Sequence, residues 1–128
     1  STKCEGESMT EALKDIYIEE KIDIYLLLLK IGANLAGYKM IKSCVIKIIK
    51  DNTKKFRMRK NLYYEIACEN NISPEDVDRL MRHAVKVSFK RDGLADFERQ
   101  YDIEFSKERP SPRELVCVLA ELYAIGKH

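Results

Sequence analysis

The sequence has little of what a membrane or secreted protein needs. No apolar run approaches the roughly 20 residues of a membrane-spanning helix. No basic stretch followed by an apolar stretch opens the chain as a leader for export. We therefore expect a cytoplasmic protein that makes no contact with a membrane.

Cysteine and histidine are scarce and scattered. The four cysteines lie far apart, at Cys4, Cys44, Cys68 and Cys117, and no pair has the short spacing of a zinc site or a redox motif. The last three fall among apolar neighbours on predicted helices. We expect buried, reduced thiols there, and neither a metal nor a cofactor.

Catalytic motifs are also missing. The sequence has no glycine-rich phosphate loop, no HExxH motif, and no serine or cysteine nucleophile with an evident base. These absences argue against an enzyme.

The helical patterns account for most of the 128 residues, a length that fits one domain. No segment alternates apolar and polar residues over a convincing strand length, and Tyr101 to Phe105 is only a weak candidate. We expect an all-α fold of about six helices, over residues 22–31, 38–50, 59–70, 73–91, 94–101 and 111–125. Residues 1–20 form either a linker or a further helix, ahead of a helical domain at 21–128.

Two helix starts share one pattern, Ser73-Pro74-Glu75-Asp76 and Ser111-Pro112-Arg113-Glu114. In each, a serine can cap free backbone N–H groups, a proline suits the first helical position, and an acid follows three residues after the serine. These are the best-marked boundaries in the chain.

Charge is distributed unevenly along the chain. Residues 37–60 contain nine lysines and arginines against Asp51 alone, whereas the segments on either side are both acidic. A basic stretch inside a near-neutral domain indicates either an anionic partner or a solvated lysine face.

The segment Leu62 to Ala84 has the pattern of a helix-turn-helix. Ala67 is small where two helices would meet, and Asn71 tolerates the left-handed backbone of a tight turn. Val77 and Leu80 would then pack the second helix against the first.

The second helix of this motif separates apolar and polar faces. Arginine can bond to guanine in the major groove, and an acid can accept from cytosine. The alternative is an ordinary surface helix with ion pairs one turn apart. We favour groove reading by helix 73–91, with five candidate base-reading residues: Arg79, Arg82, Asp78, Glu75 and His83.

Basic residues immediately before the motif suit the DNA backbone. Contacts to phosphates position a protein without reading sequence. The candidate phosphate-contacting residues are Lys54, Lys55, Arg57, Arg59 and Lys60, together with Lys86 on the second helix.

The run from Asn61 to Ala67, followed by Val77 to Val87, resembles the C-terminal effector domain of the stage-zero sporulation master response regulator of endospore-forming Firmicutes. Its recognition helix carries an arginine, two residues and then Arg-His-Ala, which match Arg79, Arg82, His83 and Ala84 here. The similarity covers roughly residues 22–125.

The resemblance implies a six-helix domain that binds promoter DNA, often as two copies on tandem sites. It also implies that the segment after the recognition helix contacts the RNA polymerase sigma factor, with Asp92, Asp96, Phe97 and Tyr101 as candidates. Glu75 and Asp76 depart from the family, which has a neutral and a basic residue there. Two carboxylates near phosphates would weaken binding or change the preferred sequence. The alternative function is therefore an interaction module that keeps the fold but has lost DNA binding.

Overall fold

The computed structural model describes residues 2–51 and 61–126, and the side chains from residue 10 onward. Six helices and no strand are present in these ranges. They are α1 (Thr2–Leu28), α2 (Ala36–Lys50), α3 (Leu62–Asn70), α4 (Pro74–Lys90), α5 (Gly93–Tyr101) and α6 (Pro112–Ile125). The all-helical prediction is confirmed.

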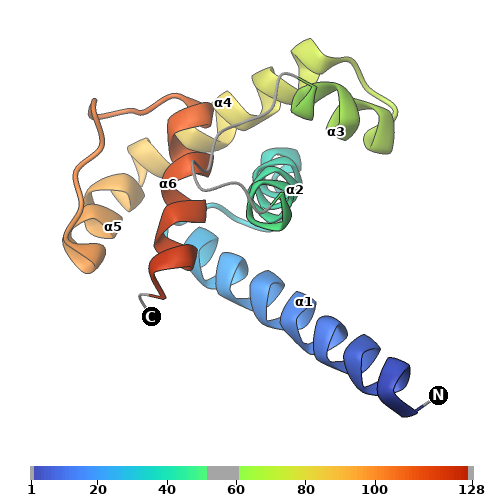
Figure 1. The fold of residues 1–128 in the computed structure, drawn as a ribbon. Helices are drawn as coiled ribbons and strands as arrows, with labels where there is room; N and C mark the ends of the chain where they lie inside the picture. The colour runs from blue at the N-terminus through green and yellow to red at the C-terminus, as the bar shows by residue number, and fades with distance from the viewer. Residues whose placement is uncertain (1, 52–60, 127–128) are drawn as a thin grey trace.

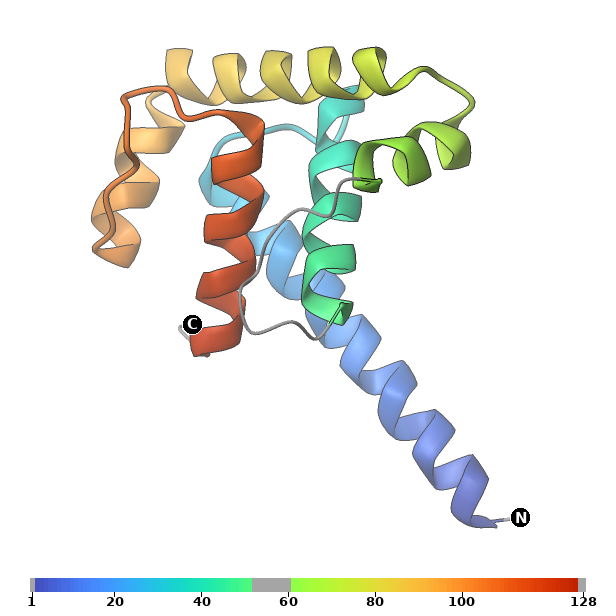
Figure 2. The ribbon, with the colours of Figure 1, turned by 45° about the horizontal axis from the view of Figure 1, so that its top comes forward.

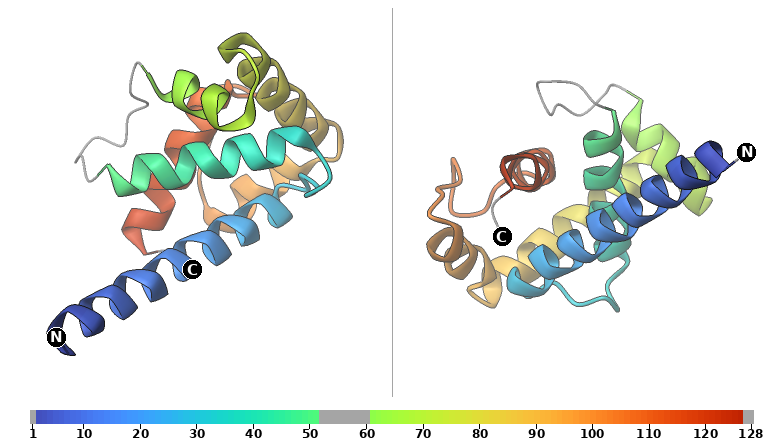
Figure 3. Two further views of the ribbon diagram at one scale, coloured as in Figure 1. Left: turned by 90° about the vertical axis from the view of Figure 1, so that its right-hand side faces the viewer. Right: turned by 60° about the horizontal axis from the view of Figure 1, so that its bottom comes forward.

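Helix α1 runs without interruption through the boundary that the sequence suggested near residue 20. Its C-terminal half contributes Ile22, Tyr25 and Leu26 to the core, each with no exposed surface. Its N-terminal part extends beyond the other helices (Figure 1; Figure 3, left). No helix in the described ranges is long and apolar enough to cross a membrane.

Helix α2 lies at the centre of the domain and packs against α1, α3, α4 and α6. Its buried side includes Ile41, Cys44 and Val45. Figure 2 shows α4 lying across the ends of α2 and α6, so that one long side of α4 forms an outer edge of the molecule. This arrangement leaves α4 available to a partner.

Glycines permit two close helix approaches. A Cβ on Gly37 of α2 would collide with the backbone carbonyl oxygen of Leu80 and lie 2.7 Å from the Cβ of Ala84. A Cβ on Gly93 would likewise collide with the carbonyl oxygen of Leu29. Both positions need a residue without a side chain. Gly37 lets α2 lie directly against α4, and Gly93 lets the start of α5 lie against the residue that follows α1.

Buried Ser88 ties α4 to the end of α1. Its hydroxyl donates a hydrogen bond to the carbonyl oxygen of Leu29 at 2.6 Å, although the side chain has no exposed surface. This bond satisfies a buried hydroxyl whose desolvation would otherwise be costly. It explains why a serine lies on the apolar side of the α4 pattern.

The cysteine prediction is confirmed at Cys44 and wrong at Cys68. Cys44 is buried, and burial raises the pKa of its thiol to about 12. Cys117 is partly buried, whereas Cys68 is exposed on α3. A nine-residue helix with a narrow buried face leaves that position toward solvent.

Candidate nucleic-acid interface

Helices α3 and α4 form the predicted helix-turn-helix. Asn71 follows α3 in the left-handed conformation, with φ 56° and ψ 42°, as its position in the turn suggested. The amide of Ile72 then bonds to the carbonyl oxygen of Ala67 at 3.1 Å, which closes the end of α3. The tight turn fixes the angle at which α4 leaves α3.

Helix α4 begins with the predicted cap. The Ser73 hydroxyl accepts a hydrogen bond from the amide of Asp76 at 3.1 Å, and Pro74 occupies the first turn. An N-cap of this kind contributes roughly 1 kcal/mol to stability. The same arrangement recurs at α6, where Ser111 accepts from the amide of Glu114 at 3.2 Å.

The two sides of α4 differ as the sequence indicated. Val77, Met81 and Ala84 have no exposed surface and face the core. On the opposite side, the side chains of Arg79 and Arg82 are 69% and 63% exposed. Both arginines are accessible to a large partner.

An acid one turn earlier holds each arginine. Arg82 donates from Nε to Oδ2 of Asp78 at 2.6 Å, and Arg79 donates from Nη2 to Oδ1 of Asp76 at 3.1 Å. The bond to Asp78 raises the pKa of Arg82, and the bond from Arg79 lowers the pKa of the Asp76 carboxyl. Surface-helix ion pairs are therefore present, as the alternative interpretation expected.

Asp78 is less available than its neighbours because a second group binds it. The hydroxyl of Tyr63 on α3 donates to its Oδ1 at 3.3 Å, while Oδ2 accepts from Arg82. The pKa of Tyr63 is raised, first by burial and then by this carboxylate. The sequence did not indicate that Asp78 links the two helices of the motif.

The remaining predicted side chains of α4 lie on the surface. Glu75, His83 and Lys86 are all exposed. Glu75 precedes Asp76 in the first turn, so two carboxylates stand at the helix start. The structure thus places every candidate of this helix on the surface or at its edge.

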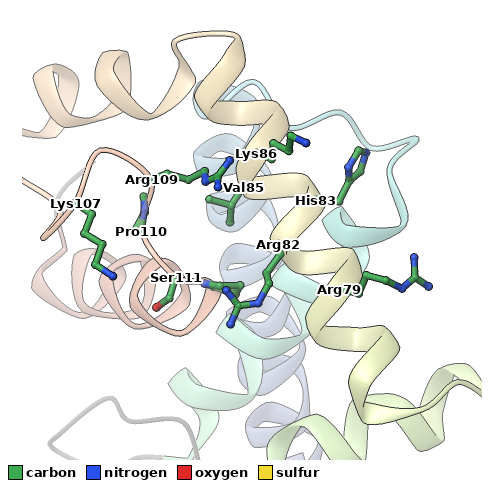
Figure 4. Close-up of a pocket in the computed structure, with 10 residues that line it drawn as sticks. Arg79, Arg82, His83, Val85, Lys86, Lys107, Arg109, Pro110 and Ser111 are labelled. Atoms are coloured by element: carbon green, nitrogen blue, oxygen red, sulfur yellow. The ribbon is translucent and has the colours of Figure 1, made fainter.

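A hollow of about 440 Å³ lies beside α4 (Figure 4). Its other wall is the segment that connects α5 to α6, which sequence reasoning did not select. None of its lining residues is acidic. They are Arg79, Arg82, His83, Val85, Lys86, Lys107, Arg109, Pro110, Ser111 and Pro112.

The basic stretch at residues 37–60 divides into two parts. On α2, Lys42 pairs with Asp23 at 3.0 Å, Lys47 with Glu69 at 2.5 Å, and Lys50 with Asp15 at 3.1 Å. These lysines neutralise acids of α1 and α3 rather than form a free cationic face. The predicted phosphate-contacting residues Lys54, Lys55, Arg57, Arg59 and Lys60 lie outside the described residues.

The segment predicted to contact the polymerase is partly buried. Phe97 has no exposed surface and Tyr101 only 7%, and their rings pack with Tyr25 in the core. Their side chains cannot form a contact surface. Asp96 is 40% exposed and bonds to Lys30 at 2.8 Å, and Asp92 is exposed.

The fold and this surface define a helix-turn-helix domain with an exposed, arginine-bearing second helix. A family model described as "Sporulation initiation factor Spo0A C terminal" matches residues 22–122. The chain therefore belongs to this family, the DNA-binding effector domain of a sporulation response regulator. It is a family of regulators and not of enzymes.

Proposed function

We propose that this chain binds specific promoter sequences by placing α4 in the major groove. The exposure of Arg79 and Arg82 on the outer side of α4 carries this proposal. A B-DNA major groove admits one helix, and α4 forms an outer edge of the domain (Figure 2).

Arg82 is the better prepared of the two arginines for reading a base. Its bond to Asp78 uses Nε, so the two terminal Nη groups can point together at guanine O6 and N7. Asp78 then positions Arg82 instead of contacting a base itself. Arg79 must first release Nη2 from Asp76.

Magnitudes favour release of these ion pairs on binding. An exposed ion pair one turn apart on a helix contributes little to stability, because both groups remain solvated. A good bidentate contact to a base contributes about 1–3 kcal/mol of discrimination. Arg79 therefore gains more from guanine than it loses from Asp76.

Glu75 and His83 complete the candidate reading surface, and Lys86 extends it toward the phosphates. We also propose that two copies of the chain bind tandem sites on the DNA, and that the chain contacts the RNA polymerase sigma factor. Of the four residues suggested for the sigma factor, Asp92 is exposed and Asp96 is partly exposed. These two can form the contact.

The second candidate is an interaction module without DNA binding. The acidic start of α4 favours this second candidate, because carboxylates there repel phosphates. The acids are Glu75, Asp76 and Asp78. The hollow beside α4 argues against this second candidate, because basic residues and no acidic residue line it. We therefore rank DNA binding first.

The experiment is selection of duplexes from a random pool, followed by affinity measurements between about 50 and 200 mM salt. A module with several phosphate contacts should lose orders of magnitude in affinity across this range. Arg82→Ala should lower the preference for the selected duplex by about 1–3 kcal/mol. If no duplex binds at about 50 mM salt, the interaction module is the better explanation.

A further inference from the structure

The hollow beside α4 is formed by two elements that are distant in the sequence. Arg79, Arg82 and Lys86 come from α4, whereas Lys107 and Arg109 come from the connection between α5 and α6. In Figure 4, Arg109 extends from this connection toward α4. Basic residues from two elements thus line one hollow.

Hydrogen bonds and burial hold the connection on both sides of Lys107 and Arg109. The amide and the hydroxyl of Ser106 both donate to the carboxylate of Glu114, at 2.7 and 2.5 Å. The amide of Phe105 donates to Glu98 at 2.8 Å, and the ring of Phe105 is buried. The backbone is therefore held at residues 105 and 106 and again at the buried Pro110. Because these points flank Lys107 and Arg109, less entropy is lost when the two side chains bind a ligand.

The acids near the connection are not directed into the hollow. Glu114 is occupied by Ser106, and Glu98 by Phe105. Glu108, between the two basic residues, is exposed but does not line the hollow. Two of the basic residues that line the hollow, Arg79 and Arg82, are paired with Asp76 and Asp78. The positive charge of the hollow therefore comes from Lys86, Lys107 and Arg109.

The start of α6 adds to this positive potential. Ser111 and Pro112, its cap and first residue, line the hollow. Unpaired amides at a helix N-terminus carry a partial positive charge that favours anions. This contribution supplements the side chains and would not define a site without them.

We propose that the segment Ser106 to Ser111 is a second DNA-contacting element, in which Lys107 and Arg109 bind backbone phosphates beside the groove that α4 reads. This inference rests on the proposed function. The hollow is continuous with the exposed face of α4 through Arg82 and Lys86, so a strand whose bases meet α4 passes its phosphates next to the connection. Both residues then set the register of α4 without reading sequence.

Single variants test the two residues. Lys107→Ala and Arg109→Ala should each weaken binding to selected and random duplexes alike, by about 3- to 10-fold at 100 mM salt, and lower the salt slope by about one. Arg99→Ala is the control for net charge. It removes one positive charge from a side chain that is 71% exposed on α5, pairs with Asp96 and does not line the hollow. Equal losses in all three variants would overturn the proposal, because net charge would then explain them.

Neutral phosphates in the DNA locate the contact. In a series of duplexes with one methylphosphonate each, one or two adjacent positions should reproduce the loss seen in Lys107→Ala. At those positions, the variant should bind the modified and unmodified duplexes equally. If the loss in affinity from Lys107→Ala and the loss from the methylphosphonate multiply at every position, Lys107 contacts no phosphate.

Two further outcomes separate the possible failures. If the wild-type chain binds no duplex at about 50 mM salt, the proposed function fails and this inference fails with it. If it binds duplexes and the Lys107 and Arg109 variants match Arg99→Ala, only the second element is rejected.

Titration with pyrophosphate tests a free anion as the ligand. Suppose that pyrophosphate binds the wild-type chain, and that Lys107→Ala abolishes this binding without changing the affinity for DNA. The hollow would then be the site of a small phosphate compound instead.

Discussion

Tyr63 on α3 donates a hydrogen bond to Asp78 on α4, so one carboxylate connects the two helices of the motif. The other oxygen of Asp78 accepts from Arg82. The orientation of an exposed arginine therefore depends on a half-buried tyrosine of the preceding helix. Support of this kind restricts the rotamers that Arg82 can adopt and prepares it for one geometry.

Removal of the tyrosine hydroxyl should reduce specificity more than stability. Tyr63→Phe keeps the packed ring and deletes one hydrogen bond, which is worth about 1 kcal/mol of unfolding free energy. Asp78 and Arg82 then become more mobile, and discrimination at the base that Arg82 reads should decrease. Duplex selection and urea unfolding measure the two effects. Tyr64→Phe is the control, because the neighbouring ring is 63% exposed. An unchanged base preference in Tyr63→Phe would contradict the linkage.

The acidic first turn of α4 should restrain DNA binding. Asp76→Asn removes a charge near the phosphates and weakens the contact that holds Arg79. We expect tighter binding, by about 3- to 10-fold at 100 mM salt, and a steeper salt dependence. Glu75→Gln removes the same charge without affecting Arg79, so it should also tighten binding, and any change in base preference should be confined to the base pair that Glu75 faces. Weaker binding in Asp76→Asn would instead show that the carboxylate positions Arg79 productively.

Local signals were sufficient to predict most of the fold. The Ser-Pro caps placed the starts of α4 and α6 correctly because they depend on only four consecutive residues. The left-handed Asn71 was predicted for the same reason. The length of α1 was left open, because its polar N-terminal part gives no helical periodicity and depends on continuation of the buried segment around Tyr25.

The candidate site could be predicted only where one helix presents it. The exposure of Arg79 and Arg82 follows from the periodicity of α4 and was predicted. The proximity of Lys107 and Arg109 to α4 was not predicted, because it depends on how α6 packs against α2. Burial of Phe97 and Tyr101 was missed too, since the resemblance indicated a contact segment without showing which side faced out. Tertiary packing determines both the proximity of these basic residues to α4 and the burial of these two rings.

Acid should destabilise the domain through Asp96. Its hydrogen bond from Lys30 lowers the pKa of this carboxyl below its usual value near 4. Because the folded pKa is the lower one, the stabilisation is complete above about pH 4 and is lost as the pH falls through the folded pKa. Asp96→Asn should therefore flatten the decrease in unfolding free energy between about pH 5 and pH 2. Urea unfolding at each pH measures it. Lys30→Met should flatten the curve in part, because Arg99 also bonds to Asp96 and lowers its pKa. The double variant should add nothing to Asp96→Asn. Additive effects would show that Lys30 is not the cause.

The close contact of α2 with α4 predicts that Gly37→Ala destabilises the domain, although helix propensity alone would predict stabilisation. Glycine-to-alanine changes in an exposed helix usually stabilise it, by about 0.5–1 kcal/mol. At Gly37 the added Cβ would collide with the Leu80 carbonyl oxygen, which belongs to the backbone and cannot rotate away. Overpacking of this kind costs about 1–3 kcal/mol, so Gly37→Ala should lower the unfolding free energy overall. Urea unfolding provides the measurement, with Ala36→Gly, at an exposed neighbouring position, as a control that should lose only the propensity difference. Because α4 must move away from α2 to admit the methyl group, the folded variant should also bind DNA less tightly. A stabilised Gly37→Ala variant would mean that the two helices are farther apart than the structure places them.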